Sequence, residues 1–220
     1  MVPVRPRVYS PRVLTNVYVD GFNLYYGLLR GTPWKWLDLE ALCRHLLPGH
    51  EVQRIRYFTA QVVVRPGEPD VDSRQQAYLR ALLTLPTVSI HLGHFLTRVV
   101  RMPLAAPAPG GPRTVEVIKT EEKGSDVNLA SYLLADAFRG DADAFVLISN
   151  DSDLMEPLRI VRHELDKVVG LLNPQARQSR ALLRCRPTFV KQIRPGVASI
   201  SQFPVEVIDK HGVIVRPETW

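Results

Sequence analysis

Uninterrupted apolar runs constrain the fold of this chain more than any other feature of its sequence. The runs Val17–Val19, Phe145–Ile148 and Val168–Leu172 contain no charged side chain. A strand with one face in water alternates polar and apolar residues, whereas a strand buried on both faces does not. We therefore expect a mostly parallel sheet that is covered on both sides.

Helix-like segments separate the apolar runs. The expected helices span residues 38–47, 73–83, 125–139 and 153–164, and further strands span residues 55–60 and 88–95. In the third helix the apolar stripe is read as Val127, Ala130, Leu134, Ala137 and Phe138, with Ser125 as N-cap and Gly140 just past the end. Alternating strands and helices predict an α/β fold with right-handed crossovers.

The remaining segments divide the chain. Residues 105–112, AAPAPGGP, predict an exposed loop because proline lacks the amide donor and glycine lacks conformational restraint. Residues 205–208 and 213–215 predict a hairpin around a glycine-bearing turn. We expect an N-terminal extension (1–15), a main domain (16–175) and a C-terminal extension with a helix and this small hairpin (176–220), which would suit a homodimer contact.

Composition favours a cytoplasmic protein with an anionic partner. The net charge is +6, and no apolar stretch approaches the length of a membrane span or of a signal peptide core. The two cysteines have no metal-ligand spacing and are expected as free thiols. Basic residues concentrate between Arg159 and Arg194. Arg159 and Arg162 are candidate phosphate contacts, although an arginine-rich solvated surface explains the same pattern.

Aspartates lie at the carboxyl ends of two of the apolar runs. Asp20 ends the first run, and Asp151 and Asp153 follow the run 145–148. Open α/β sheets bind ligands at the carboxyl ends of their strands, near a topological switch point. Asp126, in the first turn of the helix 125–139, is a further candidate.

Each aspartate also has an ordinary structural explanation. Asp20 suits a turn with Gly21, Asp126 suits the helix dipole, and Asp153 suits a helix cap. Together they are better explained as a cluster. Two strands deliver carboxylates to the same end of the sheet, and a helix cap needs only one acceptor, so it does not account for both Asp151 and Asp153. Clustered carboxylates repel one another unless a cation is bound, and oxygen-only ligands favour Mg²⁺ or Mn²⁺.

Such an ion beside a polyanion suggests phosphodiester hydrolysis. Asn23 would bond to a carboxylate or to a water, and Ser149 would orient Asp151 and lie near the substrate. Lys123 would contact the scissile phosphate, unless it is an ordinary solvated lysine.

Three stretches resemble one known family. VDGFNLYYGL, EEKGSDVNLASYLLADA and FVLISNDSDLMEPLRIV are similar to the motifs of the NYN (LabA-like) domain of the PIN-like nuclease superfamily, over residues 16–173. The resemblance implies a Rossmann-like three-layer α/β/α domain and a metal-dependent ribonuclease acting on RNA. By motif position, the matching residues are Asp20, Asn23, Asp126, Asp151 and Asp153.

Two other functions stay open. The chain would be a non-catalytic RNA-binding module if the acidic site were a relic, and an unidentified protein partner would fit either case. Similar bacterial proteins are also named 6-hydroxy-3-succinoylpyridine hydroxylase, which implies NADH-dependent oxidoreductase chemistry. Against that, no G-x-G-x-x-G loop follows the first strand, since Gly27 and Gly31 do not supply one.

Overall fold

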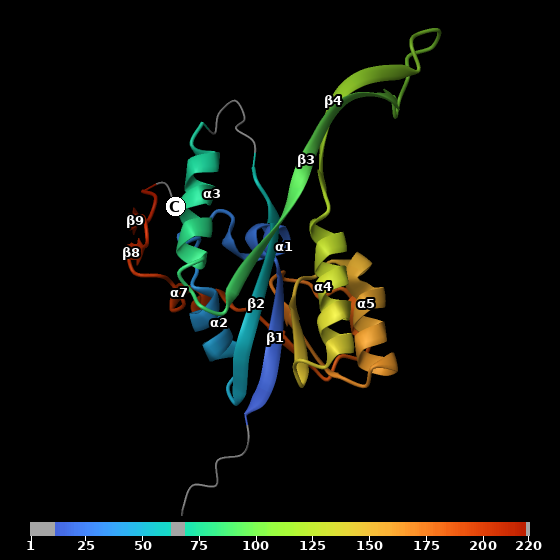
Figure 1. Ribbon diagram of the computed structural model, residues 1–220. Coiled ribbons are helices and arrows are strands. Elements are labelled where there is room, and N and C mark those ends of the chain that lie inside the picture. The colour runs from blue at the N-terminus through green and yellow to red at the C-terminus, as the bar shows by residue number, and fades with distance from the viewer. Residues whose placement is uncertain (1–11, 63–68, 219–220) are drawn as a thin grey trace, which may run out of the picture.

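One central sheet organises the molecule in the computed structural model, which describes residues 12–62 and 69–218 (Figure 1). Within those residues the sheet has seven strands in the order β4-β3-β2-β1-β5-β6-β7. The strands are β1 (Val13–Asp20), β2 (His50–Ala60), β3 (Val88–Pro103), β4 (Thr114–Lys123), β5 (Ala144–Ile148), β6 (Val168–Asn173) and β7 (Phe189–Gln192). All pairs are parallel except β3–β4. The mostly parallel α/β fold is confirmed.

Helices cover both faces of the sheet. One face carries α1 (Gly21–Leu24), its π-helical continuation η1 (Tyr25–Leu29), α2 (Leu39–Leu46), α3 (Val71–Leu82) and α7 (Pro195–Ser199). The other carries α4 (Ser125–Arg139), the 3₁₀ turn η2 (Ser152–Leu154), α5 (Met155–Arg159), the π-helical η3 (Ile160–Glu164) and α6 (Arg180–Arg184). Val17 and Val19 point into the first core and Tyr18 into the second. This two-sided burial explains the uninterrupted apolar runs.

Helix α4 presents a face that matches the predicted stripe only in part, since Ala130, Leu134 and Ala137 contact the core but Val127 and Phe138 do not. Leu129, Leu133 and Ala137 are buried, whereas Val127 and Phe138 are 70% and 69% exposed. The predicted N-cap is also wrong, because Gly124 caps the helix with φ of 98°. The closing glycine, Gly140, is correct. The face that packs against the sheet consists of residues four positions apart, Leu129, Leu133 and Ala137. It also includes a fully buried aspartate, Asp136.

The expected C-terminal extension is only partly an appendage. Its strand β7 pairs with β6, so the central sheet continues past residue 175. The predicted hairpin is confirmed as β8 (Glu206–Asp209) and β9 (Gly212–Val215), which lies beside α3 (Figure 1). Arg80 of α3 holds Asp209 through an ion pair at 2.9 Å.

Strands β3 and β4 form a long ribbon that extends beyond the body of the molecule (Figure 1). The predicted loop 105–112 lies between them. Both cysteines are free and buried, as expected, and burial raises the pKa of the Cys43 thiol to about 12. None of the helices in the described residues combines the length and apolar character of a membrane span.

Candidate metal centre

Three aspartates from distant parts of the chain converge at the switch point of the sheet. The chain runs from β1 outward through β2 and β3, then returns to the other side of β1 with β5. One carboxylate oxygen each from Asp20, Asp126 and Asp151 lies within 4.8 Å of the other two. That spacing suits three ligands of one cation.

Asp20 is fixed by the junction of β1 and α1. It ends the strand and caps the helix, and its Oδ1 accepts a 2.9 Å hydrogen bond from the backbone N–H of Asn23. Val19 pairs with Ile148 across β1 and β5, so the next residues, Asp20 and Ser149, face each other. The Ser149 hydroxyl donates to Asp20 Oδ2 at 2.9 Å.

Asp126 enters the cluster because the first turn of α4 lies against β3. A Cβ on Gly93 would come within 2.6 Å of the Lys123 carbonyl oxygen, so only glycine permits this approach. Ser125, expected as the cap, donates its N–H and hydroxyl to the Glu122 carboxylate instead. These contacts place the N-terminus of α4, with its positive dipole end, at the site.

Asp151 and Asp153 have different positions. Asp151 caps η2, and its Oδ1 accepts from the backbone N–H of Asp153 at 3.1 Å. The predicted capping role of Asp153 therefore belongs to Asp151. Asp153 is exposed and stands outside the group of three. A role for Asp153 as a water-mediated ligand stays a prediction.

The cluster holds uncompensated negative charge. Burial, the largest cause, and the nearby Asp126 and Asp151 raise the pKa of Asp20 to about 6, although hydrogen bonds oppose the rise. Burial also raises the pKa of Asp126, followed by the charge of Asp151. Throughout residues 12–62 and 69–218, no lysine or arginine forms an ion pair with these three carboxylates. A divalent cation would relieve the repulsion.

An amide network braces the two acidic loops. Asn23 Oδ1 accepts from the backbone N–H of Asn150 at 3.0 Å and from Gln175 Nε2 at 3.1 Å. Asn23 thus ties β1 to β5 and to the segment after β6. Sequence reasoning missed Asn150 and Gln175; both follow strands at the same edge, which was the available signal.

The residues predicted to contact the substrate differ in burial and in bonding partners. Ser149 is fully buried, donates to Asp20 and accepts from the Asp151 N–H, so its hydroxyl positions these two aspartates, and a substrate contact by Ser149 stays a prediction. Lys123 is half exposed and lies 3.6 Å from Glu121. Arg159 binds Glu156 and Glu164, both at 2.7 Å, and Arg162 lies 3.6 Å from Asp166. Phosphate contacts by Lys123, Arg159 and Arg162 stay predictions.

Replacing Ser149 with alanine is expected to weaken Mn²⁺ binding about 10–100-fold, the usual cost of losing a residue that orients a metal ligand. The change removes the donor to Asp20 and the acceptor for the Asp151 N–H together. Calorimetric Mn²⁺ titration measures the affinity. Ser152→Ala, at an exposed position in the same loop, is the control. Equal affinities for both variants would show that Ser149 does not organise the site.

Comparison with known proteins gives three findings. The model of the NYN domain family matches residues 14–194. The chain is 34% identical over 241 residues to a 6-hydroxy-3-succinoylpyridine 3-monooxygenase of Pseudomonas putida, covering 96% of this chain and 76% of that protein. A crystal structure of a Vibrio parahaemolyticus protein of unknown function matches with a TM-score of 0.54 and 17% identity, over 84% of this chain and 94% of the other. At this identity, the structural match supports the fold alone.

Proposed function

Because the chain belongs to the NYN domain family, we propose that it is a metal-dependent ribonuclease that hydrolyses phosphodiester bonds. The observation that carries the proposal is the convergence of Asp20, Asp126 and Asp151 within 4.8 Å, at the switch point and without a cationic partner among the described residues. The NYN family is typically one of nucleases, and such a carboxylate cluster is the kind of site that these enzymes use to hold a divalent metal.

The residues present fit Mg²⁺ or Mn²⁺. All three side chains offer hard carboxylate oxygens, and neither histidine nor cysteine joins the group. When bound, the ion supplies a Lewis acid that activates water and neutralises phosphate charge. Asp20, Asp126 and Asp151 would hold it, with Asp153 available through a water.

Residues of the chain orient the metal ligands and the substrate phosphate. Ser149 and the Asn23 N–H fix the two oxygens of Asp20, so this carboxylate cannot rotate away from the cluster. The N-terminus of α4 favours a negatively charged phosphate at the same place. Lys123, at the end of β4 just before that helix, is the candidate cation for the substrate.

Cleavage of RNA that depends on added metal tests the proposal directly. Protein freed of metal with EDTA is incubated with a labelled single-stranded RNA and the matching DNA, and Mn²⁺ or Mg²⁺ is then supplied in excess. We expect RNA products only after metal addition. Salt-dependent RNA binding without cleavage at any Mn²⁺ concentration would instead support the non-catalytic module.

The similarity to the Pseudomonas protein favours one second candidate, an NADH-dependent oxidoreductase acting on a pyridine substrate. Against it, a dinucleotide would have to place its pyrophosphate where Asp20 caps a four-residue helix, and the Gly-rich loop is missing. NADH oxidation stimulated by 6-hydroxy-3-succinoylpyridine, together with no RNA cleavage, would establish this candidate over the nuclease.

A further inference from the structure

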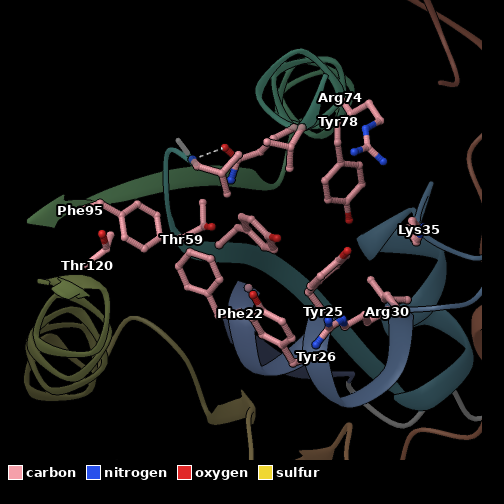
Figure 2. A pocket seen from close by; sticks show the side chains of 16 residues that line it. Phe22, Tyr25, Tyr26, Arg30, Lys35, Thr59, Arg74, Tyr78, Phe95 and Thr120 are labelled. Atoms are coloured by element: carbon pink, nitrogen blue, oxygen red, sulfur yellow. Dashed lines mark hydrogen bonds between the residues drawn. The ribbon is translucent and has the colours of Figure 1, made fainter. Parts of the chain in front are cut away.

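A cavity of about 240 Å³, called the aromatic pocket below, is lined by residues that include Phe22, Tyr25 and Tyr26 (Figure 2). Helices α1 and η1 form one wall, α3 forms the opposite wall, and β2 lies between them with Tyr57 and Thr59. Gly21 and Phe22, which directly follow Asp20, are part of the lining. An occupant of this aromatic pocket therefore lies beside the carboxylate cluster.

Flat rings dominate the pocket. Phe22 packs edge-on against Phe95 of the ribbon with ring centroids 5.9 Å apart, and Tyr25 packs against Tyr26 at 5.2 Å. Tyr25 and Tyr26, which both line the cavity, are 37% and 60% exposed. Exposed rings around a cavity are suited to stacking on another planar ring.

The charged groups of the aromatic pocket are all positive. Arg30, Lys35 and Arg74 line it, and no acidic side chain appears among its described lining residues. The guanidinium of Arg30 lies 5.4 Å from the centroid of the Tyr26 ring, and Arg74 is 3.2 Å from Asp70. The occupant should therefore combine a planar ring with an anionic group.

The size of the cavity limits what can enter. Its volume is below the roughly 300–1,000 Å³ of sites for drug-sized ligands, so one ring system with its substituents fits. A base stacked in a duplex cannot enter such a cavity, whereas an unpaired base can turn out of the strand and stack on aromatic side chains.

We propose that the aromatic pocket binds one unpaired nucleobase of a single-stranded RNA substrate, with an adjoining phosphate on Arg30 and Lys35. The identification of RNA as the natural ligand rests on the proposed ribonuclease function. Binding of a nucleotide to the pocket can nevertheless be measured in metal-free protein, without any cleavage.

The experiment titrates the full chain in EDTA with 5′-AMP, 5′-UMP, inorganic phosphate and pyridine-3-carboxylate, followed by calorimetry. We expect both nucleotides to bind more tightly than the two smaller anions. Tyr26→Ala should weaken nucleotide binding about tenfold, within the range measured for loss of one stacking partner. Lys35→Met should also weaken it. The matched controls are Phe138→Ala, an exposed ring on α4, and Lys167→Met, at the opposite end of the sheet.

Two results would overturn the pocket assignment. One is pyridine-3-carboxylate binding as tightly as the nucleotides, which would identify a site for small aromatic acids. The other is nucleotide binding that Tyr26→Ala and Lys35→Met leave unchanged. A wrong ribonuclease proposal would give a different result. The parent protein would then cut no RNA with Mn²⁺, while nucleotide binding would still depend on Tyr26.

Discussion

Asp20→Asn is expected to reduce metal-dependent RNA cleavage about a thousandfold while making the metal-free protein more stable. The loss follows because a metal ligand supports several kcal/mol of transition-state stabilisation, and about 1.4 kcal/mol corresponds to a factor of ten. The gain follows because the amide carries no charge and keeps the shape of the buried carboxylate, which is only 6% exposed.

The stability gain has a defined pH dependence. The pKa of Asp20 rises from 3.8 to about 6 on folding of the metal-free protein, chiefly through burial. The folded state therefore binds a proton that the unfolded state has released, and stability falls as pH increases from about 4 to about 6. Above that window the parent has lost about 3 kcal/mol through this group, taking 1.36 kcal/mol for each pKa unit. Asp20→Asn removes this loss.

Urea denaturation in EDTA at pH 5 and pH 8, with cleavage assays in Mn²⁺, measures both effects. Glu51→Gln removes one negative charge at an exposed position on β2, at the other end of the sheet, and serves as the control. A variant that cuts RNA at the parental rate would exclude Asp20 as a metal ligand. A variant less stable than the parent at pH 8 would mean that the carboxylate is not under electrostatic strain.

Much of the metal centre could be predicted from the strands alone. Parallel strands end at the same edge of a sheet, so the aspartates that follow Val19 and Ile148 had to approach one another once the two strands were neighbours. Asp126 was different. Its first-turn position fitted a helix dipole equally well, so it was the weaker candidate until the resemblance to the NYN motifs supported its place in the cluster.

The face of α4 could be predicted only in part, because two apolar stripes compete on this helix. Leu129 and Leu133 define one stripe, and Val127 and Leu134 belong to the other. Which stripe is buried depends on how α4 approaches the sheet. Gly93 and Gly124, which are distant in sequence, set this approach through their close contact. The ribbon strand β4 was missed because TVEVIKTEEK is largely polar and, within the described parts of the chain, it pairs with β3 alone.

The aromatic pocket shows a further limit of sequence reasoning. Its lining comes from the segment after β1, from β2, from α3 and from the β3–β4 ribbon. No single segment has a motif for a base-binding cavity. Only Phe22, Tyr25 and Tyr26 gave a signal, because they follow Asp20 within one short stretch.

The largest effect on stability is expected at Asp136, a fully buried carboxylate on α4. It accepts hydrogen bonds from the Tyr18 hydroxyl at 2.9 Å and from Arg56 Nε at 2.8 Å and Nη2 at 3.0 Å. Burial by itself would raise the pKa of Asp136, but the bonds from Arg56 and Tyr18 outweigh burial and hold it below its usual value. Asp136 therefore stabilises the fold above its unfolded pKa, and this contribution is lost as pH falls through the lower folded pKa.

Asp136→Ala should lower the free energy of unfolding by about 3–5 kcal/mol, because it leaves the buried Tyr18 hydroxyl and the largely buried guanidinium of Arg56 without their carboxylate partner. Arg139→Ala, which removes a 67% exposed side chain 3.4 Å from the same carboxylate, should cost less than about 1 kcal/mol. Urea denaturation at pH 7 compares the two. A loss for Asp136→Ala no larger than that for Arg139→Ala would mean that the network contributes nothing net to stability.

A double-mutant cycle separates the ion pair from simple loss of packing. Asp136→Leu with Arg56→Met replaces both charges by apolar groups, and removing both members of a buried pair costs far less than removing one. The double variant should therefore be more stable than the sum of the two single losses predicts, by at least about 1 kcal/mol. Additive losses would show that the two side chains act independently, and that α4 is held to β1 and β2 by its apolar face alone.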